Sequence, residues 1–257
     1  DGDVLRALVA SGSRGIGFMP ADAVAEIPNV TWIRQPFSRA YFNLSADLIL
    51  ARQTPQYVWD VRELLTNLHK LAFEWHAPVL FEVQNTHFQL NTLDVWSLRY
   101  ERCHYFSPHS LWQAVNMVRF TPTTQSRPYN ERLLSILTMP LATPLHVPPN
   151  GMVNPKPFVQ GSRIKVAEWS ATLGQMRQQQ DRVVVWKATS RSVTFLNILP
   201  SRRVIQYVID AQYAGQFIPR AGQAVKSLDF LQRYQPDVVI VMDERSREDF
   251  GRILPTL

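Results

Sequence analysis

The first half of the chain alternates short apolar runs with stretches of helical periodicity. The runs at residues 15–20, 46–52 and 77–83 are typical of buried parallel strands. Between the last two runs, apolar side chains recur every three or four positions and predict a helix from about Val58 to Glu74. The other elements predicted in this half are an amphipathic helix and an antiparallel hairpin, at Pro108–Val118, Arg119–Pro122 and Arg132–Thr138.

The second half shows a regular alternation of strand and helix patterns. It begins with a predicted helix from Ser162 to Gln180, for which the Ser162 hydroxyl is the expected N-cap. Such alternation implies a parallel sheet with helices on both faces. The alternating elements are Arg182–Ala188, Ser190–Leu199, Arg203–Asp210, Ser227–Tyr234, Pro236–Met242 and Ser246–Leu254.

A proline-rich stretch separates the two halves. Prolines crowd the segment from Met139 to Phe158, and Asn150-Gly151 lies between them. Proline removes backbone donors and forbids regular elements, so we predict a linker at residues 140–161, between domains at 1–139 and 162–257. The predicted fold class is α/β, with two three-layer Rossmann-like domains.

Composition places the chain among folded proteins outside the membrane. Of its 257 residues, 46% are hydrophobic and 19% charged, which excludes a disordered chain. No apolar run approaches the roughly 20 residues that cross a bilayer, so we expect no membrane insertion. The first residues resemble neither a signal peptide nor a transit peptide. The single cysteine, Cys103, excludes an internal disulfide and a multi-cysteine zinc site, and we expect no metal.

The net charge bears on partners. It is +6, with a pI near 9.7, and a basic surface attracts polyanions such as RNA. The basic residues are dispersed, however, and the longest basic run is Arg202-Arg203. Dispersed charge is equally typical of an ordinary solvated surface, so both interpretations stay open.

The segment from Arg99 to Ser107 carries the main candidate chemistry. It resembles the Tyr-x-Glu-His-x-x-x-Phe-Ser signature of the SAM-dependent sugar C-methyltransferases, which methylate a carbon of nucleotide-linked deoxysugars. Glu101, Phe106 and Ser107 match that signature. The tyrosine position holds Arg99 and the histidine position holds Arg102.

The N-terminal residues extend this resemblance. Asp1, Gly2 and the following residues are similar to the end of the methyltransferase Gly-rich turn, where glycine lets the backbone approach SAM closely. The resemblance implies a class I methyltransferase fold that lacks its first strand in this sequence, and we expect the natural protein to extend upstream. The family carries an acid for the ribose hydroxyls where this chain has Met19, so Asp1, Gly2 and Met19 mark a vestigial SAM site.

The second half resembles the C-terminal domain of the same family. Residues 185–192 stand where that family reads Gly-Tyr-Gly-Ala-x-Ala-Lys, and Asp210 ends the next strand as it does there. Val185 and Lys187 replace both glycines of the turn, and Glu244-Arg245 replaces a Trp-Asn pair. The apolar strand positions are kept while the residues of the site are exchanged.

The resemblance also indicates which catalytic groups are missing. Methylation of a sugar carbon requires a base that removes a proton next to a keto group. Gln56 falls nearest one family histidine position and Arg102 occupies the other. Glutamine can hydrogen-bond a substrate but cannot shuttle a proton near neutral pH. Neither His87 nor His104 falls on a family histidine position.

Two functions are compatible with this pattern. The first is a catalytically inactive methyltransferase-like protein with no cofactor, acting as a structural subunit of a large intracellular complex. Its expected partners are protein subunits and RNA, as in a mitochondrial ribonucleoprotein. The alternative is an active SAM-dependent enzyme for an anionic acceptor that uses Glu101, Gln56, Arg99 and Arg102, because arginine forks bind phosphates. The two arginines are also compatible with an ion pair to Glu101 or Asp94, or with a partner contact.

Overall fold

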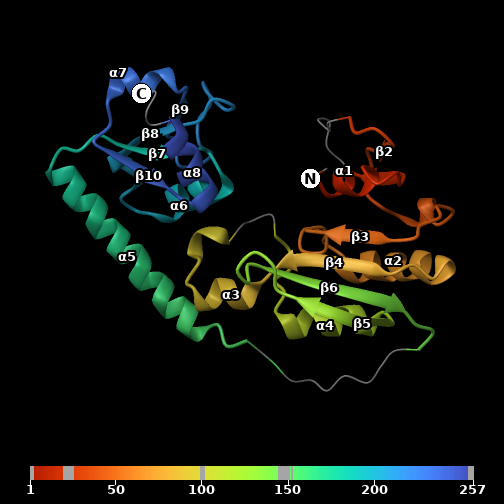
Figure 1. Ribbon diagram of the computed structural model, residues 1–257. Coiled ribbons are helices and arrows are strands. Elements are labelled where there is room, and N and C mark those ends of the chain that lie inside the picture. The colour runs from red at the N-terminus through yellow and green to blue at the C-terminus, as the bar shows by residue number, and fades with distance from the viewer. Residues whose placement is uncertain (1–2, 20–25, 99–101, 144–150, 152, 254–257) are drawn as a thin grey trace. The chain divides into compact units, whose positions relative to one another are not determined.

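The structure is a computed structural model that describes residues 3–19, 26–98, 102–143, 151 and 153–253 (Figure 1). The contacts within it divide the chain into two compact units. Unit 1 comprises residues 1–83, 109–128 and 133–149, and unit 2 comprises 84–108, 129–132 and 150–257.

Unit 1 contains two sheets. A two-stranded parallel sheet pairs β1 (Gly15–Phe18) with β2 (Val30–Ile33), next to α1 (Asp3–Val9). A four-stranded sheet has the order β3-β4-β6-β5, in which β3 and β4 run parallel and β5 and β6 antiparallel. The predicted C-terminal hairpin of this half is therefore confirmed. The bounds of these strands are Ile49–Arg52 for β3, Val79–Gln84 for β4, Phe120–Ser126 for β5 and Leu133–Pro140 for β6.

Helix α2 (Val61–Trp75) begins and ends where local chemistry dictates. The Asp60 carboxylate accepts a 2.8 Å hydrogen bond from the Glu63 backbone N–H, which is an N-cap. The helix ends at His76, whose φ of 51° lies in the left-handed region. One face is buried, as the periodicity predicted, through Leu64, Leu65, Leu68, Leu71 and Ala72.

Helix α4 (Pro108–Met117) is the other long helix of this part of the chain and agrees with the predicted element.

Aromatic side chains pack the four-stranded sheet of unit 1 against α2. The Phe81 ring of β4 meets the Phe120 ring of β5 edge-on at 5.3 Å between centroids, and His69 of α2 meets Phe120 at 5.2 Å. Phe81 and Phe120 have no exposed surface.

Unit 2 is built on a four-stranded sheet in the order β10-β7-β8-β9, with every pair parallel. The chain runs from β7 outward to β8 and β9, then returns to the other side of β7 as β10. The order therefore reverses between β7 and β10, as in doubly wound nucleotide-binding sheets. The bounds are Val183–Trp186 for β7, Ile205–Ile209 for β8, Ala224–Lys226 for β9 and Val238–Val241 for β10.

Helices cover both faces of this sheet. On one face Val183 and Val185 pack with α5 (Lys156–Gln178) and α6 (Ser190–Ile198). On the other face Val184 and Trp186 pack with α7 (Asp229–Tyr234) and α8 (Glu244–Ile253). Alternate residues of β7 thus serve opposite cores, which confirms the predicted three-layer α/β arrangement for this unit.

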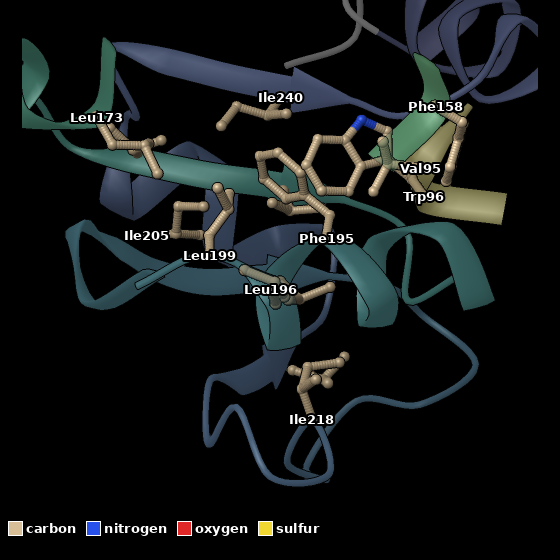
Figure 2. Packing of buried hydrophobic residues seen from close by; sticks show 14 residues of the cluster. Val95, Trp96, Phe158, Leu173, Phe195, Leu196, Leu199, Ile205, Ile218 and Ile240 are labelled. Atoms are coloured by element: carbon tan, nitrogen blue, oxygen red, sulfur yellow. The ribbon is translucent and has the colours of Figure 1, made fainter. Parts of the chain in front are cut away.

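A segment that precedes the proline-rich stretch also enters the core of unit 2. Helix α3 (Thr86–Asn91) leads into a short 3-10 helix, η2 (Val95–Ser97), whose Trp96 is 5% exposed. The Trp96 and Phe195 rings lie edge-on at 4.9 Å, and Figure 2 shows them together at the centre of the cluster. Val95 and Trp96 therefore pack with the C-terminal sheet.

The structure corrects several predicted elements. Helix α5 begins at Lys156, six residues before the predicted N-cap Ser162, because Pro157 is tolerated in a first helical turn. The Ser162 hydroxyl instead donates to the Val159 carbonyl at 2.9 Å. The sequence pattern did not predict the short elements α1, β2, α3 and β9, or the 3-10 helices η1 (Arg39–Tyr41), η2 and η3 (Arg202–Val204).

Candidate functional site

The carboxyl ends of β3 and β4 are joined by polar contacts in unit 1. Arg52 ends β3, and its Nε and Nη2 lie 2.9 and 2.8 Å from the Glu82 carboxylate on β4. The next residue, Gln53, donates its backbone N–H to the Glu82 carbonyl at 2.7 Å and has a left-handed φ of 56°. Both side chains of the ion pair are largely buried, so this strand end is held together by its own charges.

Gln56, nearest the family's first histidine position, is part of the same strand end. Its side chain is 1% exposed and donates from Nε2 to the Gln53 Oε1 at 2.8 Å. An amide has no accessible protonation near neutral pH. Gln56 therefore acts here as a hydrogen-bonding group inside unit 1.

Met19 follows β1 at the position where the family carries an acid. Its backbone N–H donates to the Ile33 carbonyl at 3.0 Å and so extends the β1–β2 pairing by one bond. The thioether is half-buried. A thioether is at most a weak hydrogen-bond acceptor, so Met19 does not replace the carboxylate that binds ribose hydroxyls in nucleotide-binding folds.

Arg102, at the family's second histidine position, is buried in unit 2 with 5% exposure. Its Nη1 donates to the Gln89 Oε1 at 3.0 Å, and its Nη2 donates to the Gln84 Oε1. Gln89 in turn donates from Nε2 to the same Gln84 oxygen at 2.8 Å. The guanidinium also lies 5.0 Å from the centre of the Tyr105 ring.

The end of the signature that matches the family, Phe106-Ser107, has a structural role in this fold. The Phe106 carbonyl accepts a 2.9 Å bond from the Thr86 N–H, and Phe106 pairs with Asn85 in an isolated bridge. Phe106 and Ser107 are 7% and 6% exposed. Phe106 and Ser107 are therefore buried, and Phe106 is hydrogen-bonded to the start of α3.

Four of the predicted site residues lie outside the described residues, namely Asp1, Gly2, Arg99 and Glu101. Asp94, a predicted alternative partner of Arg99 and Arg102, instead binds Arg191 with both carboxylate oxygens, at 2.6 and 2.8 Å.

The turn after β7 is the second candidate site, because it lies at the reversal of strand order in unit 2. Lys187 adopts a left-handed φ of 64° where the family has glycine, and its ammonium pairs with Asp249. The Ala188 N–H donates to the Asp210 carboxylate at 2.9 Å. That carboxylate occupies the side of the turn where a phosphate would bind in a dinucleotide-binding fold.

Helix termini at this edge are also capped internally. Thr189 caps α6 by accepting from the Ser192 N–H at 3.3 Å, and Asp243 accepts from the Ser246 N–H at 2.8 Å. The ion pair with Lys187 lowers the pKa of the Asp249 carboxyl below its usual value. The charged and polar groups at the carboxyl ends of these strands thus largely form ion pairs and hydrogen bonds with one another.

A shallow groove of about 310 Å³ lies on unit 1 beside the N-terminus of α2. Its arginines and acidic residues offset each other in number. The lining residues are Arg39, Asp60, Arg62, Glu63, Thr66 and Asn67. Within the part of the chain that the structure describes, no three His, Cys, Asp or Glu side chains gather as metal ligands, and no helix is long and apolar enough to cross a bilayer.

The fold of unit 2 defines a parallel, three-layer α/β domain of Rossmann type. Residues 158–251 match the sequence profile of the C-methyltransferase C-terminal domain. Residues 158–251 are therefore similar to the C-terminal domain of C-methyltransferases, as the resemblance of the second half predicted.

Comparison with solved structures finds the crystal structure of methyltransferase CalO6. The two chains share 13% identity with a TM-score of 0.37. The match covers 54% of this chain and 53% of CalO6, so it spans about half the length of each. No curated protein matches the chain.

Proposed function

We propose that this is a methyltransferase-like protein that does not transfer methyl groups and that serves as a structural subunit of a larger intracellular assembly. The observation that supports this most directly is the state of Gln56 and Arg102. Gln56 falls nearest one histidine position of the family and Arg102 occupies the other, and both are at least 95% buried and hydrogen-bonded to glutamines. Side chains held in this way stabilise the fold.

The chemistry of these two side chains supports the proposal. Removal of a proton next to a keto group needs a base with a pKa near the working pH. The Gln56 amide does not accept a proton in that range, and the Arg102 guanidinium does not release one. Loss of one general base typically costs about two to four decades in rate.

Cofactor binding is also disfavoured. SAM would need an acceptor for its ribose hydroxyls at the end of β1, and Met19 supplies none. In unit 2, the Ala188 N–H of the β7–α6 turn is already bonded to Asp210. We therefore propose that the protein functions without SAM, with protein subunits and RNA as its partners and the mitochondrial matrix as one candidate location.

The alternative is an active SAM-dependent enzyme with an anionic acceptor. It draws support from the Arg102 guanidinium, which is held rigidly by two amide oxygens and could serve as a fixed anion contact. In that case Arg102→Lys should raise the acceptor KM much more than it weakens SAM binding. A purely structural Arg102 would instead lower thermal stability and leave any KM unchanged.

The deciding experiment is isothermal titration calorimetry of the complete protein with SAM and with S-adenosylhomocysteine. We expect no heat of binding up to about 500 µM ligand, which corresponds to less than about 4.5 kcal/mol of binding free energy. Micromolar binding together with methyl transfer to a nucleotide sugar would refute the proposal. A thermal melt of the same sample confirms that the protein tested is folded.

A further inference from the structure

The loop between β8 and β9, residues 210–223, exposes an aromatic and a basic side chain near the amino ends of the strands of unit 2. The chain leaves β8 after Ile209 and returns to the opposite edge of the sheet to begin β9 at Ala224. Its last part folds against β9. The Val225 N–H donates to the Gln216 carbonyl at 2.8 Å, and the Ile218 N–H donates to the Gln223 carbonyl at 2.9 Å.

Three contacts anchor this loop to the body of the unit. Ile218 is 3% exposed and belongs to the core, where Figure 2 shows it on its loop below Leu196. The Asn197 side chain of α6 donates to the Pro219 carbonyl at 3.1 Å. The Gln223 side chain donates to the Arg202 carbonyl of η3 at 2.9 Å. The loop is therefore fixed next to η3.

The anchored loop exposes an aromatic ring and a cation. Phe217 is 68% exposed, although its neighbour Ile218 already supplies the apolar anchor. Arg220 is exposed and has a left-handed φ of 62°. That conformation costs a non-glycine residue about 1 kcal/mol, so folding alone does not favour arginine here. We call Phe217, Arg220, Arg202 and Arg203 the η3 surface.

The two segments that form the η3 surface are basic. The segments 197–209 and 211–224 contain no Asp or Glu. Among the described residues, neither Arg203 nor Arg220 forms an ion pair, and the Arg202 side chain reaches only the Leu199 carbonyl. Asp181 and Asp237 lie at the same sheet edge, where Arg182 precedes β7. The Asp237 carboxylate is held by Arg182 at 3.1 Å, and this contact lowers its pKa to about 2.

We infer that the η3 surface binds single-stranded nucleic acid, with the arginines on phosphates and Phe217 stacked on a base. Guanidinium groups pair with phosphate oxygens through two parallel hydrogen bonds, and release of counterions drives such binding. An exposed ring stacks on any unpaired base, which a duplex does not offer. This inference rests on the RNA partner in the proposed function and assigns that partner to particular residues.

The test is fluorescence anisotropy of the full chain with a labelled 12-nucleotide oligo-uridylate at 50 and 150 mM salt. Phe217→Ala should weaken binding at least 5-fold, since one stacked base contributes about 1–3 kcal/mol. Arg220→Ser should weaken it and lower the slope of log K against log salt by about 0.7. Phe217→Tyr should bind like the wild type, because it keeps the ring.

A matched control separates a specific surface from diffuse charge. Arg163→Ser removes one exposed arginine from α5, far from this loop in sequence, and should leave the affinity within about 2-fold. Equal weakening by Arg163→Ser and Arg220→Ser would overturn the inference, as would equal binding of a duplex or the absence of binding at 50 mM salt. Preference for an acidic peptide over the oligonucleotide would overturn it as well. SAM titration of the same sample measures cofactor binding, so it tests the proposed function separately from the binding of the oligonucleotide.

Discussion

Arg191 and Asp94, which lie 97 residues apart in the sequence, form a two-pronged ion pair in unit 2. The two guanidinium nitrogens lie 2.8 and 2.6 Å from the two carboxylate oxygens. The Arg191 Nε also donates to the Met242 carbonyl after β10 at 3.2 Å. One side chain thus ties α6, the end of β10 and the segment before η2 together.

This segment has two further attachments to α5. Lys165 donates from Nζ to the Leu93 carbonyl at 2.8 Å. Gly161 faces the Leu93 side chain, where a Cβ would lie 2.6 Å from a methyl carbon. Residues 93–98 are therefore integral to the C-terminal domain in this protein, although the proline-rich stretch separates them from it in the sequence.

We expect Arg191→Ala and Asp94→Ala each to reduce the free energy of unfolding. The side chains are 27% and 17% exposed, and the pair is bidentate, so a coupling of about 1–2 kcal/mol is expected, above that of exposed pairs. Urea unfolding of both single variants and the double variant would measure this coupling. Additive single effects would mean that the two residues stabilise the fold independently.

Gly17→Ala should destabilise unit 1. A Cβ at Gly17 would lie 2.2 Å from the Trp32 ring, which covers this position of β1. Overpacking of this kind typically costs about 1–3 kcal/mol. Gly174→Ala is the matched control, because nothing lies within 4 Å of its Cβ and alanine favours the interior of α5 by about 1 kcal/mol. Thermal melts should move in opposite directions for the two variants.

Lys187 offers a test of the backbone strain in the turn after β7. Lys187→Gly and Lys187→Ala both lose the pair with Asp249, but only glycine adopts φ 64° without a steric penalty. The glycine variant should therefore be more stable than the alanine variant by about 1 kcal/mol. Equal unfolding midpoints for the two variants would show that the turn relaxes to another conformation.

His69 should make stability depend on pH. Burial lowers the pKa of His69 below its ordinary value of 6.5, and its Nε2 lies 2.9 Å from the Leu141 carbonyl. The unfolded chain then binds the proton more tightly than the folded one, so stability is fully present above pH 6.5 and falls as the pH drops below it. His69→Gln should reduce the change in melting temperature between pH 7.5 and 5.5. A variant with an unchanged pH dependence would assign it to other groups.

The local pattern predicted the elements with long or regular periodicity. Helix α2, helix α4 and the strands β3, β4, β7 and β10 appear where apolar spacing placed them, within a few residues. Other short elements, such as β9 and α3, escaped prediction because they lack the continuous apolar runs that mark β7 and β10. The start of α5 was wrong because Ser162 resembles an N-cap, whereas a proline-containing turn extends the helix upstream.

Only part of the candidate site could be predicted from the sequence. The exchanges at Gln56, Arg102 and Lys187 were visible as departures from a family motif. Their burial and hydrogen bonds were not, because Gln89 and Gln84 lie 13 and 18 residues from Arg102 in the sequence and meet it only in the tertiary structure. The exposure of the Phe217 ring could not be predicted from the sequence either, because it depends on which of the neighbours Phe217 and Ile218 is buried.

The amino-acid sequence by itself determined the α/β class, the alternation of elements in the second half and the identity of the exchanged residues. These follow from side-chain periodicity and residue chemistry, which are properties of neighbours along the chain. Only the tertiary structure decided that Asp94 and Trp96 pack with the C-terminal sheet and that Arg102 is buried. Such contacts join residues distant in sequence, and their partners are chosen when whole elements pack together.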